Sequence, residues 1–235
     1  MNNYIIGISV ILMTYNLSKI LYGLFNNDKK FEKQELNLTK FNLSDIKIGN
    51  NILIIGKHKT GKTTLISKIL DFHNEIHTDI IISPTECLEK VYKKYNVIPY
   101  YNSSIIKDFI KNQKENINDS TIACNECFII LDNCFLHSEY NDPNLTDLLI
   151  NGYYYKTINI IATAYPLEFS KYFKSSIDYL CIFNNTHIIY INLIYEEYFN
   201  NLLNYNDYID LLNKYTNNYG CIIIDFKNNG KFYYF

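Results

Sequence analysis

The stretch from Gly56 to Thr63 reads GKHKTGKT and has the residue types and spacing of a phosphate-binding loop. It matches the pattern GxxxxGK[ST] in full, with an apolar run before it and an apolar-faced run after it. Backbone N–H groups of such a loop, and of the helix that follows, converge on phosphates, and its glycines permit close approach. We therefore expect a nucleotide here, bound by Gly56, Lys57, His58, Lys59, Thr60, Gly61, Lys62, Thr63 and Thr64.

Two side chains of this loop and one acid further along the chain have distinct chemical roles. The Lys62 ammonium is expected to reach the β- and γ-phosphates, and the Thr63 hydroxyl to ligate Mg²⁺. Asp132 ends the apolar run FIILD, where a carboxylate binds Mg²⁺ or its water shell. The expected cofactors are therefore ATP and Mg²⁺, with Thr63 and Asp132 as the metal-binding pair.

The residue after Asp132 bears on whether the nucleotide is hydrolysed. Hydrolytic P-loop enzymes of this type usually have an acid there that activates water, whereas this chain has Asn133. An amide orients a water molecule but cannot accept its proton at neutral pH. The motif therefore supports nucleotide binding more strongly than turnover.

Composition limits the class of protein and its chemistry. A chain of 235 residues with 48% hydrophobic and 20% charged residues can bury one large core, which excludes a disordered chain. A net charge of −2 excludes a globally basic nucleic-acid coat, although a local basic patch stays open. All 22 residues counted as Lys+Arg are lysine, so the chain has no guanidinium fork to offer.

Apolar runs bounded by turn residues alternate with helical patterns through the rest of the chain. Strands are expected at 51–55, 79–83, 127–131, 157–163, 179–183 and 221–226, and helices at 62–72, 104–114, 144–151, within 194–203 and at 208–215. The turn at 228–230 then leads into KFYYF, which predicts a C-terminal β-hairpin. Continuous Ile-rich strands between helices predict an α/β fold whose mainly parallel sheet is buried on both faces.

The domain proper is expected over residues 38–235, preceded by an extension over 1–37. The extension has an apolar segment, 4–25, and a polar linker, 26–37. Asn16 and Lys19 interrupt the apolar segment, so it falls short of the ~20 residues that span a bilayer, and it lacks the basic start and cleavage site of a signal peptide. We expect an element packed on the domain, with a weak membrane anchor as the alternative. The six cysteines, most of them in apolar runs, suggest a reducing compartment.

Several segments in sequence order resemble the DNA-packaging ATPases of poxviruses and other nucleocytoplasmic large DNA viruses, within the FtsK–HerA superfamily. They cover roughly residues 38–226 and read FNLSDIKIGNNILIIGKHKTGKTTL, DIIISPTE, FIILDNCF, LLINGYYYKTINIIATAYPL, SSIDYLCIF and NKYTNNYGCIIIDF. The resemblance implies a three-layer, RecA/ASCE-like P-loop NTPase core with an extra strand between the P-loop strand and the strand ending in Asp132. It also implies a homo-oligomeric ring on double-stranded DNA, with ATP hydrolysis at subunit interfaces driving the genome into a capsid.

The same resemblance implies a location and further partners. The protein would work in the host cytoplasm, at the viral factory, or in the virion. Residues 1–37 lie outside the resembling segments and are where we expect any contact with a capsid or a membrane.

Four departures from the family pattern point towards weakened hydrolysis, and one is the segment Asn151-Gly152-Tyr153-Tyr154 in place of an NGRH-like run. Besides Asn133, the polar residue expected before the Tyr-Pro pair is replaced by Ala164. The arginine expected shortly before the IDY segment, a finger for a neighbouring subunit's γ-phosphate, is Lys174. Lysine supplies charge without bidentate geometry. The expected catalytic set is therefore Lys62, Asp132, Asn133 and Lys174, and the alternatives are a hydrolysis-impaired paralogue with a structural or regulatory role and an unrelated P-loop enzyme such as a small-molecule kinase.

Other polar and aromatic groupings have plainer interpretations. Tyr153–Tyr155 with Lys156 could line a DNA pore, but a half-buried surface is the favoured interpretation. His137 with Glu139 could supply a substitute base, and His73 with His77 or the single Cys124–Cys127 pair could bind a metal. In each case ordinary loop or core residues are the favoured interpretation.

Overall fold

The computed structural model describes residues 37–85, 91–118, 126–135, 139–165, 169–185 and 187–235. Their strands form a nine-stranded sheet in the order β1-β9-β8-β7-β2-β6-β5-β3-β4. The strands are β1 (Thr39–Lys40), β2 (Asn51–Ile55), β3 (His77–Ile82), β4 (Val97–Ile98), β5 (Cys127–Asp132), β6 (Thr157–Thr163), β7 (Tyr179–Phe183), β8 (Cys221–Asp225) and β9 (Lys231–Tyr234). The helices are α2 (Lys62–Phe72), α4 (Ser103–Asn118), α5 (Pro143–Asn151), α6 (Lys171–Ser175), α7 (Ile188–Ile194) and α8 (Tyr205–Tyr215), with single turns η1 (Leu43–Asp45), η2 (Glu139–Asn141), η3 (Tyr195–Phe199) and η4 (Phe226–Asn228).

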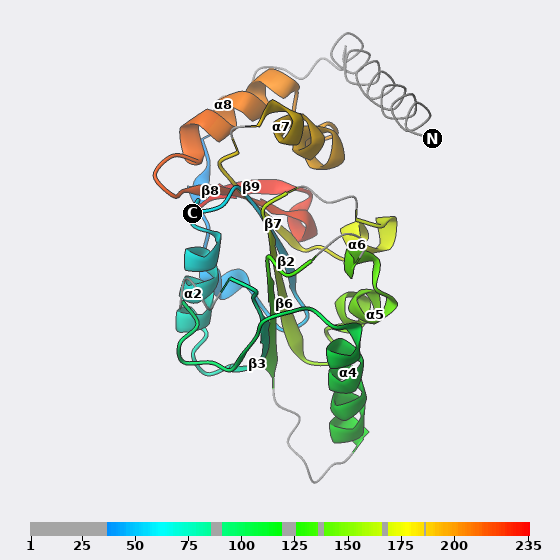
Figure 1. Ribbon diagram of the computed structural model, residues 1–235. Coiled ribbons are helices and arrows are strands. Elements are labelled where there is room, and N and C mark those ends of the chain that lie inside the picture. The colour runs from blue at the N-terminus through cyan, green and yellow to red at the C-terminus, as the bar shows by residue number, and fades with distance from the viewer. Residues whose placement is uncertain (1–36, 86–90, 119–125, 136–138, 166–168, 186) are drawn as a thin grey trace, which may run out of the picture.

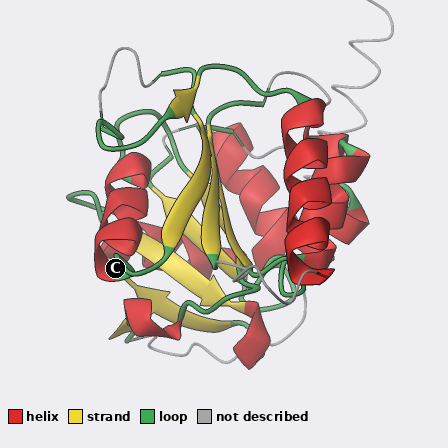
Figure 2. Cartoon of the chain, turned by 90° about the horizontal axis from the view of Figure 1, so that it is seen from below, coloured by secondary structure: helices red, strands yellow, loops and turns green. Residues whose placement is uncertain are grey.

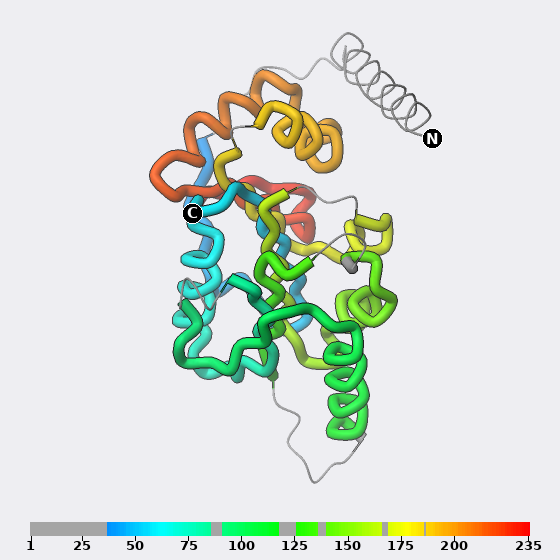
Figure 3. Tube along the Cα trace, in the orientation of Figure 1, coloured from blue at the N-terminus to red at the C-terminus, as the bar shows by residue number. Residues whose placement is uncertain are grey.

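The sheet is parallel except for one strand. Neighbouring strands from β7 through β2, β6, β5 and β3 to β4 are parallel pairs. β8 is antiparallel to both β7 and β9, and β1 pairs in parallel with β9, so the first and last described strands lie side by side (Figure 3). The predicted C-terminal hairpin is therefore confirmed as β8 and β9, although the antiparallel direction of β8 was not part of the prediction.

Helices cover both faces of the sheet, which gives three layers. α2 lies on one face and α4, α5 and α6 on the other, with α7 and α8 near the β8 and β9 end (Figures 1 and 2). Side chains of β2 alternate between the layers, because Ile52 and Ile54 join the core under α2 whereas Leu53 and Ile55 join the core under α4 and α5. The predicted burial of the sheet on both faces is confirmed.

The strand order confirms the expected core topology. β6 lies between β2, which leads into the phosphate loop, and β5, which ends in Asp132. The predicted strands and long helices are all present, with β3 starting earlier and α4 ending later than expected. The short β1, β4 and α6 were not predicted. The helix expected within 194–203 in fact begins at Ile188 and continues as a π-helical turn, η3.

The apolar segment 4–25, and the linker apart from residue 37, lie outside the described residues. Among the residues that are described, none of the helices has the length and apolar composition needed to cross a bilayer. The cysteines found there are buried, namely Cys127, Cys134, Cys181 and Cys221. Burial raises the pKa of the Cys181 and Cys221 thiols, so both behave as small core residues.

A buried amide pair fixes the strand that leads into the phosphate loop. Asn51, the first residue of β2, is 3% exposed, and its Nδ2 donates to the carbonyls of Leu149 (2.8 Å) and Ser176 (2.7 Å). Its Oδ1 accepts from Asn159 Nδ2 of β6 at 2.8 Å. The Asn51 side chain thus forms hydrogen bonds with a carbonyl near the end of α5, a carbonyl directly after α6 and a side-chain amide of β6. A polar residue at this apolar position is therefore explained by three buried partners.

Replacing Asn51 by alanine is expected to lower the free energy of unfolding by about 3 kcal/mol, because two carbonyls and one amide then lose their buried partner. Urea denaturation of wild type and variant measures the loss. Asn201→Ala is the matched control, since Asn201 is exposed and its loss should change stability by less than about 0.5 kcal/mol. Equal stabilities for the two variants would contradict the role of the Asn51 network.

Candidate nucleotide-binding site

The loop between β2 and α2 has a backbone suited to enclosing phosphates. Gly61, directly before α2, has φ 112°, and Lys59 has φ 62°, both in the left-handed region. A Cβ on Gly56 would lie 2.5 Å from Phe183 Cβ, so only glycine fits against the end of β7. The loop is tied to its neighbours by the amides of Gly56 and Lys57, which donate to the carbonyls of Thr163 (3.2 Å) and Asn184 (3.3 Å).

The start of α2 supplies the donors that an anion needs. The first N–H groups of a helix have no partner within it, and here no side chain caps them, since the residue before the helix is Gly61. Together with the helix dipole these amides favour a phosphate group. The 11 residues of α2 and its buried apolar face hold this end firmly against the sheet.

Lys62 points back over the loop from the first turn of α2. Its side chain is 4% exposed, and its Nζ donates to the carbonyl oxygens of Gly56 (2.7 Å) and Lys57 (3.0 Å). The ammonium is thereby held where the loop closes, which is the position expected for a group that contacts the outer phosphates.

Asp132 lies at the base of the loop and accepts hydrogen bonds from three side chains. Its Oδ2 accepts from the Thr63 hydroxyl (3.1 Å) and the Tyr92 hydroxyl (2.9 Å), and its Oδ1 accepts from Asn133 Nδ2 (3.0 Å). The carboxyl group is 1% exposed. The structure therefore brings together Thr63 and Asp132, the two oxygen donors predicted to hold Mg²⁺, and this donor set suits that hard cation.

Asn133 presents its amide oxygen without a partner. The residue has φ 50°, and its backbone N–H donates to the Ala162 carbonyl at 2.9 Å. Because Nδ2 bonds to Asp132, the orientation of the amide is set and Oδ1 faces away from the carboxylate. Oδ1 is buried and accepts no hydrogen bond within the described part of the chain. It is thus an unsatisfied acceptor at the edge of the phosphate loop.

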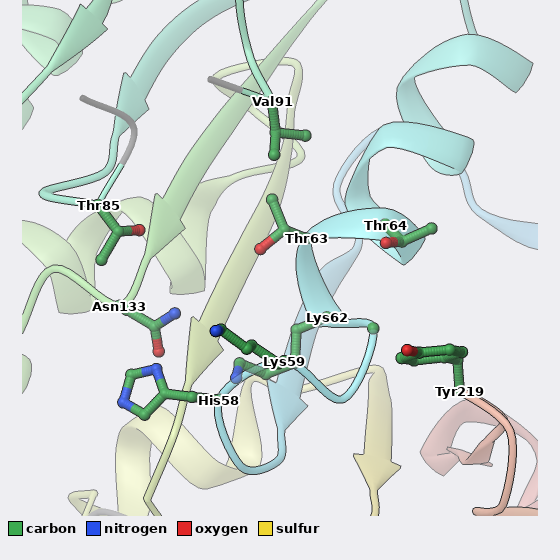
Figure 4. Close-up of a pocket in the computed structure, with 10 residues that line it drawn as sticks. His58, Lys59, Lys62, Thr63, Thr64, Thr85, Val91, Asn133 and Tyr219 are labelled. Atoms are coloured by element: carbon green, nitrogen blue, oxygen red, sulfur yellow. The ribbon is translucent and has the colours of Figure 1, made fainter. Parts of the chain in front are cut away.

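Part of the phosphate loop, the start of α2 and Asn133 border an open pocket of about 360 Å³ (Figure 4). Seven predicted residues line it, namely His58, Lys59, Gly61, Lys62, Thr63, Thr64 and Asn133. Gly56, Lys57 and Thr60 shape the loop behind them, with the Thr60 hydroxyl donating to the Lys57 carbonyl at 2.7 Å. The pocket volume is in the range of small-molecule sites.

The structure adds four residues that the sequence analysis missed. Thr85, Val91 and Tyr219 line the pocket, and Tyr92 reaches Asp132 from behind it. Thr85 follows β3 in the segment SPTE, so its position at a strand end was a usable signal. Val91 and Tyr92 lie in a loop without a motif, and Tyr219 lies in the segment NKYTNNYGCIIIDF without a predicted role, so only the fold brings them to the site.

Lys174 lies apart from this pocket, in α6. It forms an ion pair with Glu197 of η3, and its side chain is 26% exposed. Its predicted action on a neighbouring subunit's nucleotide stays a prediction.

The other groupings show ordinary packing where they are described. His73 Nε2 lies 3.0 Å from the Leu43 carbonyl, and His77 pairs with Asp79 at 3.9 Å. Within the described ranges no three His, Cys, Asp or Glu side chains gather as a metal site. Tyr155 is buried and its neighbours Tyr153 and Tyr154 are exposed. His137 and Cys124 lie outside the described residues.

The mostly parallel sheet, its strand order and the loop between β2 and α2 define an α/β P-loop NTPase fold. No family model matches the chain. Protein 015R of frog virus 3 (isolate Goorha) is 25% identical over 185 residues, which cover 75% of this chain and 56% of that protein, so the match spans little more than half of this relative. Protein 075L of invertebrate iridescent virus 6 is 26% identical over 216 residues, covering 87% of this chain and 82% of that protein.

A solved structure shares the fold. It is the genome packaging NTPase B204 from Sulfolobus turreted icosahedral virus 2, in complex with ATPγS. The TM-score is 0.56 at 15% sequence identity, and the alignment covers 79% of this chain and 95% of that one. At 15% identity the comparison shows a shared fold, and that fold agrees with the three layers described above.

Tyr92→Phe is expected to raise the Mg²⁺ concentration needed for half-maximal ATP binding by about tenfold, since residues that orient a metal-binding carboxylate have effects of this order. Nucleotide binding without Mg²⁺ should be unchanged. Calorimetric titrations at a series of Mg²⁺ concentrations give the midpoint.

Tyr101→Phe is the matched control for this variant. Tyr101 is also buried and donates to a carboxylate, that of Asp142, at 2.5 Å, but it does not line the pocket. An unchanged midpoint in Tyr92→Phe, or the same shift in both variants, would show that Tyr92 has no part in metal binding.

Proposed function

We propose that this chain binds Mg²⁺-ATP at the phosphate loop and acts as a genome-packaging ATPase, hydrolysing ATP within a homo-oligomeric ring to move double-stranded DNA into a capsid. The observation that carries the nucleotide site is the contact of Thr63 Oγ1 with Asp132 Oδ2 at 3.1 Å, directly beneath the loop. A hydroxyl from the loop and a carboxylate from β5 meet there although 69 residues separate them.

Different residues of the site bind different parts of Mg²⁺-ATP. The backbone amides at the start of α2 and the Lys62 ammonium bind and orient the phosphates, and Thr63 and Asp132 hold Mg²⁺. When bound, the ion neutralises charge on the phosphate oxygens. The lysines at 57 and 59 add to the positive potential of the loop within a chain whose net charge is −2.

The packaging role is supported by resemblance and by the comparisons together. The family-like segments occur in order over most of the chain, relatives occur in frog virus 3 and invertebrate iridescent virus 6, and B204, with the same fold, is by its name a genome packaging NTPase. Work in the host cytoplasm or the virion follows from this role. The ring, the DNA and the use of Lys174 across an interface are part of the proposal.

Asn133 favours a second candidate, a nucleotide-binding subunit that does not hydrolyse ATP. Its Oδ1 can accept a hydrogen bond from a water and orient it, but the amide takes no proton from that water. Lys174, engaged by Glu197, adds charge without the two parallel bonds of an arginine. Such a subunit would regulate or complete a motor instead of driving it.

Steady-state ATPase assays with and without duplex DNA separate the two candidates. Wild type is expected to show slow turnover that DNA stimulates, and Lys62→Ala to show none. Asn133→Asp supplies a proton acceptor and is expected to raise turnover about 100-fold, the lower range for general base catalysis. Lys68→Ala is the matched control, since Lys68 is an exposed lysine of the same helix outside the pocket.

One result would overturn the first candidate, and another would show that the loss of activity in Lys62→Ala is not specific. If wild type shows no Lys62-dependent turnover at any protein concentration with DNA, the translocase role fails, and ATP binding alone would leave the regulatory subunit. If Lys68→Ala and Lys62→Ala lose activity equally, the loss does not report on the phosphate loop.

A further inference from the structure

Tyr219 has a backbone conformation that bulky residues rarely adopt. It lies in the loop between α8 and β8, where Asn218 has φ 52° and Tyr219 has φ 65°. Asparagine tolerates this left-handed region, whereas an aromatic residue there is a genuine outlier. Such strain persists where the surrounding structure imposes it, often at ligand sites. The ring itself is 74% exposed, so burial of the ring does not account for the conformation.

The ring of Tyr219 lies beside the phosphate loop. A Cβ on Gly61 would lie 3.3 Å from Tyr219 Cβ and 3.4 Å from its carbonyl oxygen, so this residue packs against the loop itself. Tyr219 lines the pocket, and in Figure 4 it lies near Thr64, on the opposite side of Lys62 from Asn133. Among the described residues its ring stacks on no other aromatic ring. One flat aromatic surface in the pocket therefore has no described aromatic ring stacked on it.

The direction of the nucleotide follows from the other end of the pocket. Lys62, Thr63 and Asp132 define the position of the outer phosphates and the metal. Asn133 closes that end. The inner phosphate and the nucleoside must then extend the other way, past Thr64 and towards Tyr219.

We propose that the Tyr219 ring is the surface on which the base of the bound nucleotide stacks. This inference rests on the proposed nucleotide site and extends it to the nucleoside. Stacking on an aromatic face requires a flat base and reads no hydrogen-bonding edge, so the ligand class is a nucleoside triphosphate. The loop accepts an unfavourable backbone conformation at Tyr219 in order to hold the ring at this place.

Comparing ATP with inorganic tripolyphosphate isolates the base, because tripolyphosphate offers the loop the same phosphates without a nucleoside. Binding of both to the full chain is measured by calorimetry with Mg²⁺. Tyr219→Asn removes the ring and suits the left-handed backbone, so the variant should fold at least as well as wild type. It is expected to bind ATP about five- to a hundredfold more weakly, with tripolyphosphate affinity unchanged.

Two further variants complete the test. Tyr219→Phe keeps the ring and should bind ATP like wild type. Asn218→Gly alters the adjacent left-handed residue but leaves the ring, and it should also bind ATP like wild type.

Each contrary outcome has a separate meaning. Unchanged ATP affinity in Tyr219→Asn, or an equal loss for ATP and tripolyphosphate, overturns the stacking role and leaves the phosphate site standing. Equal wild-type affinity for the two ligands does the same. If wild type binds neither ligand, or if Lys62→Ala binds both as well as wild type, the proposed nucleotide site fails and the stacking surface fails with it.

Discussion

The site depends on one carboxyl group that is almost wholly removed from water. Asp132 is 1% exposed, and a polar group at that depth is costly unless hydrogen bonds replace its hydration. Thr63, Tyr92 and Asn133 supply them from three different segments. One carboxyl group therefore fixes the relative positions of the phosphate loop, the end of β5 and the loop around residue 92. The same carboxylate that organises these segments is the group that suits Mg²⁺.

The fold supplies the rigid frame for this contact. With β6 between β2 and β5, the loop after β2 and the acid at the end of β5 meet across one intervening strand. The Asn51 network ties the start of β2 to α5, α6 and β6, and Phe183 packs against Gly56 at its other end. The phosphate loop thus rests on a strand fixed at both ends, which is the preorganisation that anion binding by backbone amides needs.

Local patterns were enough to predict the main strands, the long helices and a phosphate-loop motif after β2, because each is encoded in a short run. Buried parallel strands read as continuous Ile-rich segments, and the loop motif carries its own chemistry from Gly56 to Thr63. Tyr92 and Tyr219 could not be found this way, since 40 residues separate Tyr92 from Asp132 and Tyr219 meets Gly61 only in the folded chain. The pairing of β1 with β9 and the direction of β8 likewise depend on tertiary register, as does the contact of Lys174 with Glu197.

An experimental structure with Mg²⁺ and a slowly hydrolysed ATP analogue tests the central claim most directly. The account predicts the phosphates along residues 56–64, Mg²⁺ beside Thr63 Oγ1 and the Asp132 carboxylate, and a nucleoside extending past Thr64. An analogue bound elsewhere, or a phosphate loop left empty at saturating analogue concentration, would contradict it.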